Sequence, residues 1–264
     1  MLMEAKVAVV TGGASGNGRA IAERLAREGA SVFIGDVNEA GLDQVVAGIR
    51  EAGGDAIGVR CDVSDEGDVE ALMAAAEAKG GPNALVAQAG IIFESTLEDS
   101  SLEDWERHMA VDVRGTFLCA RAAIPRMRAL GGGSIVCMSG TYAFQVEPGV
   151  AASATAKGAI LAMTRAIAVE NGIDGIRCNC IAPGYIETPM VARWADAQPD
   201  PAAARHSAAQ MHALGRMGTP EEIGSMAAFL CSDESSFCTG QCYFVDGGLS
   251  SGTNAFQYTP TPIR

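Results

Sequence analysis

Short apolar runs alternate with helix-length amphipathic stretches, and this alternation most constrains how the 264-residue chain can fold. The apolar runs cover residues 7–10, 31–34, 57–60, 84–87, 134–138, 176–181 and 241–245. Parallel strands joined by helices give this pattern, because both faces of such a sheet are buried. The sequence therefore predicts an α/β fold, with a doubly wound, mostly parallel seven-stranded sheet and helices on both faces. In such folds ligands bind outside the carboxyl ends of the strands.

The pattern predicts one domain over residues 1–249, because no internal repeat, heptad run or second domain interrupts it. Residues 194–205 are rich in Ala, Pro and Asp, and we interpret them as part of a mobile lid at about residues 186–217. Residues 250–264 form a polar, Pro-containing C-terminal tail in this interpretation.

Charge and hydropathy exclude two classes of partner. The chain has 32 acidic against 19 basic residues, a net charge of −13, which repels nucleic-acid phosphates. It has no apolar run of 18 residues, so we expect no membrane partner. The first residues lack the pattern of a secretion signal, and we expect a cytoplasmic protein. Eight scattered cysteines without C-x-x-C pairs are interpreted as free, mostly buried thiols, and no metal site is expected.

A glycine-rich loop follows the first predicted strand directly and opens a helix. It reads Thr11-Gly12-Gly13-Ala14-Ser15-Gly16-Asn17-Gly18, and such a turn lets a pyrophosphate approach the backbone at the start of the helix. Asp36 ends the next strand, where a carboxylate accepts a hydrogen bond from a ribose 2′-hydroxyl and repels a 2′-phosphate. Ser15 and Val37 occupy the positions expected for an arginine, so NAD(H) is favoured over NADP(H). The structural alternative is a tight turn with an incidental aspartate.

Together with segments 61–63, 183–190 and 244–248, the spacing T-G-x-x-x-G-x-G resembles the short-chain dehydrogenase/reductase family over nearly the whole chain. The resemblance implies a Rossmann-type fold, NAD as cofactor, and a small-molecule alcohol or ketone as substrate. It also implies a homotetramer joined through the helices around 116–127 and 153–169 and through the last strand. The residues that it assigns to the cofactor are Gly12, Ser15, Gly16, Asn17, Gly18, Asp36, Asp62, Val63, Gln88, Gly90, Lys157, Pro183, Gly184, Ile186 and Thr188.

The catalytic positions that the resemblance implies depart from the family pattern. Family members use a Tyr-x-x-x-Lys pair on one helix, a serine after the fifth strand and an asparagine in a proton relay. Lys157 is present here, but Ser153 stands at the tyrosine position and Gly140 at the serine position. Asp112 replaces the asparagine, and Gln88 replaces the asparagine of the family's Asn-Ala-Gly segment.

A serine cannot take over the proton chemistry of tyrosine. Its hydroxyl has a far higher pKa than a phenol, whose unperturbed value is about 10, and its side chain is shorter. Tyr142, two residues past Gly140, is the best candidate for a relocated proton donor, and a packing aromatic is the alternative interpretation. Lys157 is a second candidate, and Asp112 is expected to pair with it.

Three functions remain open on the sequence. The first is an NAD(H)-dependent oxidoreductase that interconverts a secondary alcohol and a ketone with a non-standard proton donor. The second is an NAD(H)-binding protein without hydride transfer, and the third is a lyase or isomerase on the same scaffold. His108, His206 and His212 are interpreted as structural or surface residues, with His206 and His212 in the expected lid.

Overall fold

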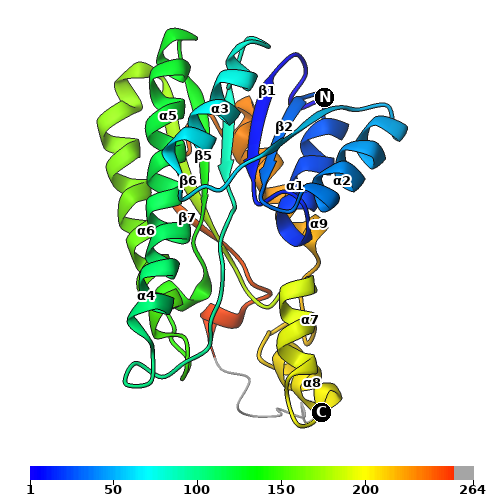
Figure 1. The fold of residues 1–264 in the computed structure, drawn as a ribbon, viewed down its shortest axis with the longest axis vertical. Helices are drawn as coiled ribbons and strands as arrows, with labels where there is room; N and C mark the ends of the chain where they lie inside the picture. The colour runs from blue at the N-terminus through cyan, green and yellow to red at the C-terminus, as the bar shows by residue number, and fades with distance from the viewer. Residues whose placement is uncertain (253–264) are drawn as a thin grey trace, which may run out of the picture.

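The structure, a computed structural model, describes residues 1–252, so most of the predicted tail lies outside the described residues. The described chain forms one seven-stranded sheet in the order β3-β2-β1-β4-β5-β6-β7, and every neighbouring pair is parallel (Figure 1). The strands are β1 (Val7–Thr11), β2 (Ser31–Asp36), β3 (Asp55–Arg60), β4 (Ala84–Ala87), β5 (Gly133–Met138), β6 (Ile176–Pro183) and β7 (Cys242–Val245). The predicted fold class is confirmed.

Helices cover both faces of the sheet, as continuous apolar strands require. One core joins α1 (Gly16–Arg27), α2 (Glu39–Glu51) and α9 (Pro220–Cys231) to the sheet. The other joins α3 (Glu66–Glu77), α5 (Gly115–Ala129) and α6 (Ala151–Asn171) to the opposite face. The strand order reverses between β1 and β4, and this switch point opens a crevice at the carboxyl ends of the strands.

A π-helical turn at Met109–Arg114 connects α4 (Leu102–His108) to α5. The wider turn inserts an extra residue into the helical ladder, and such turns are frequent at functional sites. Asp112 lies in this turn with none of its surface exposed. The local backbone therefore delivers a carboxylate into the interior between α5 and α6.

The segment that the sequence marks as a lid contains two helices, α7 (Pro189–Asp196) and α8 (Pro201–Gln210). They lie beyond the end of the sheet, apart from the helices that cover its faces (Figure 1). Each begins with a proline after a capping side chain: Thr188 accepts a hydrogen bond from the Val191 amide, and Asp200 accepts one from the Ala203 amide. Their movement stays a prediction.

All eight cysteines are free thiols. The sulfur atoms of Cys137 and Cys178 lie 4.0 Å apart and form no disulfide. Residues 1–252 contain no group of three or more His, Cys, Asp or Glu side chains that could hold a metal ion. No helix in that range is long and apolar enough to cross a membrane.

Candidate active site

The loop between β1 and α1 depends on glycine at several positions. Gly12 and Gly16 have φ angles of +68° and +52°, in the left-handed region that favours glycine. A Cβ at Gly12 would lie 2.7 Å from Ala89 Cα, and one at Gly18 would lie 2.1 Å from the Gly12 carbonyl oxygen. The close packing brings the start of α1 to the crevice, where its amides and helix dipole favour an anion.

Two aspartates at the ends of neighbouring strands line the same cavity. Asp36 is the last residue of β2, and Asp62 follows β3. Asp36 is fixed by its own backbone surroundings, because its carboxylate accepts hydrogen bonds from the amides of Ala14 and Asn38, both at 3.0 Å. Asp62 accepts hydrogen bonds from the Ser64 hydroxyl at 2.7 Å and the Ser64 amide at 2.9 Å. The hydroxyl bond is the main reason why the pKa of Asp62 is lowered. Both side chains therefore present oriented acceptors to the cavity.

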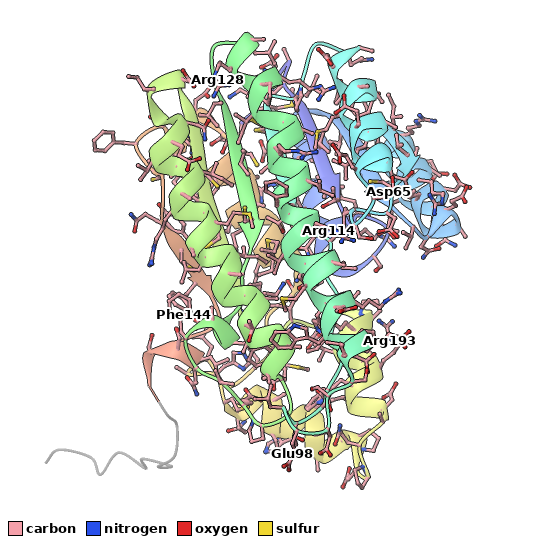
Figure 2. The ribbon with its side chains drawn as sticks, turned by 60° about the vertical axis from the view of Figure 1, so that its left-hand side comes forward. Asp65, Glu98, Arg114, Arg128, Phe144 and Arg193 are labelled. Atoms are coloured by element: carbon pink, nitrogen blue, oxygen red, sulfur yellow. The ribbon has the colours of Figure 1, made fainter. Side chains whose placement is uncertain are left out.

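Sequence reasoning considered only Ser15 and Val37 as positions for an arginine beside Asp36, and strand pairing adds a third. Arg60 is the β3 register partner of Asp36, a neighbour that only strand pairing reveals. Its guanidinium, however, donates to Asp68 Oδ2 at 2.7 Å. Two other arginines line the cavity itself, Arg107 on α4 and Arg193 on α7. Figure 2 labels Arg193.

Two buried amide oxygens in this cavity have no hydrogen-bond partner among the described residues, Asn17 Oδ1 and Gln88 Oε1. Buried acceptors in native proteins are nearly always paired, so both call for a donor from outside the chain. The ribose hydroxyls of a dinucleotide are donors of this kind. With the glycine turn and the two aspartates, the residues present fit a dinucleotide cofactor.

Most residues that the sequence assigns to the cofactor lie in two adjoining cavities. The outer cavity is lined by Gly12, Ser15, Gly16, Asn17, Asp36, Asp62, Val63, Gln88, Gly90 and Thr188. The inner cavity, about 190 Å³ in volume, adds Lys157, Pro183, Gly184 and Ile186. Gly18 lines neither cavity and acts beneath the loop, where it allows the close contact with Gly12.

Lys157 lies at the floor of the inner cavity and is held by two acceptors. Its Nζ is 2.9 Å from Asp112 Oδ2 and 3.2 Å from the Met138 carbonyl oxygen. Asp112 in turn accepts a hydrogen bond from the Ile91 amide at 2.9 Å through its other oxygen. The expected pairing of Asp112 with Lys157 is therefore present as a buried ion pair, with side-chain exposures of 0% and 17%.

The inner cavity also brings together the other residues that the sequence singled out. Ser153 is buried one helical turn before Lys157 on α6, and Gly140 follows β5 in extended backbone. A Cβ at Gly140 would meet Lys157 Cγ at 3.5 Å, an ordinary van der Waals distance. Tyr142 lines the same cavity from the turn after Gly140. Asp112 reaches the cavity through Lys157.

Sequence reasoning missed the side chains that surround Tyr142. The Tyr142 hydroxyl lies 3.4 Å from the Tyr185 hydroxyl, and Tyr185 donates to Glu147 Oε2 at 2.7 Å. Burial raises the pKa of both phenols. Trp194 packs on the Tyr185 ring with 5.6 Å between centroids, and Glu94 lines the cavity at its exposed edge. The signal for Tyr185 was its place in segment 183–190, but nothing local marks Glu147 as its partner.

The three histidines have different places. His206 is exposed on α8, whereas His108 is fully buried, with its ring edge-on to Phe93. His212 is also fully buried: its Nε2 accepts a hydrogen bond from the Tyr185 amide at 3.1 Å, and its Nδ1 lies 2.8 Å from the Ala208 carbonyl oxygen. His212 therefore fixes the backbone of a cavity tyrosine and does not itself line the inner cavity.

Comparison with known proteins gives matches over nearly the whole chain. A family model described as enoyl-(acyl carrier protein) reductase matches residues 12–250. Cis-4-hydroxycyclohexanecarboxylate dehydrogenase of Sinomonas cyclohexanicum is 41% identical over 248 residues, covering 93% of this chain and 97% of the relative. Cyclopentanol dehydrogenase of Comamonas testosteroni is 40% identical, covering 93% and 97%. The crystal structure of levodione reductase superposes with a TM-score of 0.92 at 33% identity, covering 95% of this chain and 99% of that one.

Proposed function

Because the chain belongs to the short-chain dehydrogenase/reductase family, we propose that it is an NAD(H)-dependent oxidoreductase that interconverts a secondary alcohol and a ketone with a non-standard proton donor. One observation carries the proposal: a cavity suited to a dinucleotide adjoins a second cavity that contains Lys157, Tyr142 and Ser153. Such an arrangement would allow a small molecule to bind against the reactive end of the cofactor.

Bound NAD⁺ supplies a hydride acceptor, and the protein's part is to hold it and to manage the proton. Asp36 would accept a hydrogen bond from the 2′-hydroxyl of the adenosine ribose. NADP(H) carries a phosphate at that position, which the carboxylate would repel, so NAD(H) is favoured. Lys157 has three N–H donors, of which two point to Asp112 and Met138. The third remains for a ribose hydroxyl of the cofactor. Asn17 and Gln88 would pair their buried amide oxygens with further hydroxyls.

The substrate in this proposal is a ring alcohol. One relative is named for an alcohol on a cyclohexane ring and another for an alcohol on a cyclopentane ring. Tyr142, Tyr185 and Trp194 give the inner cavity aromatic walls that suit a ring of this size. Tyr142 is the proposed proton donor to the ketone, because Ser153 is too weak an acid for that role.

The second candidate function is an NAD(H)-binding protein without hydride transfer. The observation that favours it is Ser153 at the helical position from which the family's tyrosine would act, one turn before Lys157. Titration with cofactor does not separate the two candidates, but turnover does.

The test combines binding with turnover. Calorimetric titration is expected to give a micromolar Kd for NADH and at least tenfold weaker binding of NADPH, a preference that Asp36→Ala removes and the exposed Asp43→Ala keeps. Oxidation of cyclopentanol, cyclohexanol, cis-4-hydroxycyclohexanecarboxylate and 1,4-cyclohexanediol is then followed as NADH absorbance. Tyr142→Phe should lower turnover at least as strongly as Ser153→Ala.

Each alternative predicts a different result. Equal affinity for NADH and NADPH would refute the role of Asp36. Tight NADH binding with no reduction of NAD⁺ by any of the four alcohols would favour the second candidate. Full activity in Tyr142→Phe would remove Tyr142 from the mechanism.

A homotetramer is also part of the proposal. Apolar side chains stay exposed on two of the elements that the resemblance assigns to subunit contacts, Phe117 on α5 and Val169 on α6. A second copy would remove them from water, which is the usual reason for large exposed apolar residues at one face.

A further inference from the structure

A chain of three oxygen-bearing side chains leads from the inner cavity toward solvent. It begins at the Tyr142 hydroxyl, passes to the Tyr185 hydroxyl at 3.4 Å, and ends at Glu147 Oε2 a further 2.7 Å away. Tyr185 and Glu147 come from loops that are 38 residues apart in the sequence. Resting on the proposed alcohol–ketone activity, we propose that Glu147 is the terminal base of alcohol oxidation and takes up the substrate proton through Tyr185 and Tyr142.

The proposed reaction needs such a base, because neither Lys157 nor Tyr142 can accept the substrate proton alone. The Lys157 ammonium has no lone pair to accept a proton, and it is bound to a fully buried carboxylate. Burial raises the pKa of Tyr142, so its phenol stays neutral. A neutral phenol accepts a proton only if it gives up its own at the same time, and Tyr185 is the group in position to receive it.

The hydrogen bonds already run in the direction that alcohol oxidation requires. Tyr142 donates to Tyr185, and Tyr185 donates to Glu147, whose side chain is partly exposed. The 3.4 Å spacing between the phenols is long for an O–H···O bond, and catalytic hydrogen bonds commonly shorten when substrate binds. A proton that reaches Glu147 is therefore one step from water.

The step balances without a further reactant. The carbinol C–H bond of the alcohol breaks and its electron pair leaves as hydride to NAD⁺, while the O–H bond breaks and the C=O bond forms. The hydroxyl proton moves to the Tyr142 oxygen, the Tyr142 proton to Tyr185, and the Tyr185 proton to Glu147. Glu147 then releases a proton to water. Ketone reduction uses the same groups in reverse.

Glu147 has neighbours from three different loops. The groups that interact with it electrostatically are Tyr185 after β6, Tyr142 after β5 and Glu94 after β4. Burial and the charge of Glu147 raise the pKa of Glu94.

Two neighbours hold the middle of the relay in place. The Tyr185 ring packs on Trp194 at 5.6 Å, and its backbone amide donates to the buried His212. Both contacts restrain Tyr185 without using the hydroxyl that binds Glu147. Trp194 and His212 are positioning residues in this mechanism.

The experiment measures kcat against pH for the alcohol that the wild-type protein oxidises fastest. Glu147→Gln keeps the shape of the side chain but removes the base, and should lower kcat about 100-fold and abolish the acid limb of the profile. Glu147→Asp should restore the limb in part. Glu98→Gln, on the exposed loop at the lower edge of Figure 2, is the matched control and should leave the profile unchanged.

Two further measurements separate a relay from a structural role. Because the members act in series, Tyr185→Phe combined with Glu147→Gln should cost no more than the more damaging single change. Added acetate should restore turnover in Glu147→Ala, since a small carboxylate can enter the space left by the side chain. NAD⁺ affinity, measured calorimetrically, should be the same in all of these variants.

The outcomes distinguish the relay from the function on which it rests. An active wild type whose Glu147→Gln variant keeps kcat and the acid limb would overturn the relay and leave the proposed oxidoreductase standing. A wild type that binds NADH but transfers no hydride would overturn both. If Glu147→Gln fails to fold, Tyr185→Phe carries the same test, because it breaks both hydrogen bonds while keeping the ring on Trp194.

Discussion

Replacement of Asp112 by Asn is expected to destabilise the free protein by leaving Lys157 without a counter-charge. Asp112 is fully buried and the Lys157 side chain is 17% exposed, so water can solvate neither charge well if the other is removed. Breaking a buried pair by removing one partner costs about 3–5 kcal/mol. We expect about 3 kcal/mol for Asp112→Asn, the lower end of that range, because the amide still accepts from Ile91 and Lys157 keeps Met138 and some solvent.

Lys157→Met should cost more than Asp112→Asn, because it strands the carboxylate that has no exposure at all. For a chain of 264 residues the entropy of unfolding is about 0.55 kcal/mol per degree, so about 3 kcal/mol lowers Tm by roughly 5 °C. The double variant has neither charge of this pair and should recover part of the loss. Calorimetric Tm and urea unfolding of the four proteins, without cofactor, give the coupling free energy.

The matched control is an exposed pair, Arg128 with Asp174 at 2.6 Å, for which Asp174→Asn should cost less than 1 kcal/mol. Strictly additive single and double variants, or a Lys157→Met protein as stable as the wild type, would refute the buried-pair reasoning. Such a result would also favour Lys157, the second candidate for the proton chemistry, as a proton-transfer group.

The remaining predictions concern the substituted site and the acid stability of the fold. Ser153→Tyr combined with Gly140→Ser should raise ring-ketone reductase activity at least tenfold, since a Cβ fits at Gly140 and the tyrosine would sit one turn before Lys157; steady-state kinetics decide, and no gain would contradict the assigned positions. Arg216 and the Thr219 amide lower the pKa of Glu222 to about 2, so this carboxylate stabilises the fold above its ordinary pKa of about 4.5 and loses that effect as pH falls toward 2. Thermal melts should therefore show Glu222→Gln less stable than wild type at pH 7, with the difference fading below pH 4.5; the difference should be small, because the group is partly exposed, and one that persists at pH 2 would contradict the sign.

Local signals predicted what local physics determines. The glycine turn, Asp36 and the strands were readable because tight turns and buried strands restrict their own residues. The pairing of Asp112 with Lys157, 45 residues apart, came from the family resemblance. Helix α8 was interpreted only as lid sequence because its alanines give no apolar period, although Asp200-Pro201 is a recognisable helix start.

Contacts between loops could not be predicted in this way. Arg60 is a neighbour of Asp36 only through strand register, and the bond from Tyr185 to Glu147 depends on where two loops meet. His212 reaches the Tyr185 amide through the packing of the segment after α8. No periodicity or spacing in the sequence encodes these meetings, because loop paths are set by the elements that they connect.

Lys157 in the inner cavity and Glu147 at the end of the relay differ in a way that argues for separate roles. Lys157 is paired with the buried carboxylate of Asp112, and in the proposed function its charge faces the cofactor. Glu147 is bound to a phenol that can pass a proton, and it stands partly in water. In the proposed mechanism the two tasks are separate, with charge held at Lys157 and proton exchange carried by Tyr142, Tyr185 and Glu147. The pH profile of Glu147→Gln measures that separation directly.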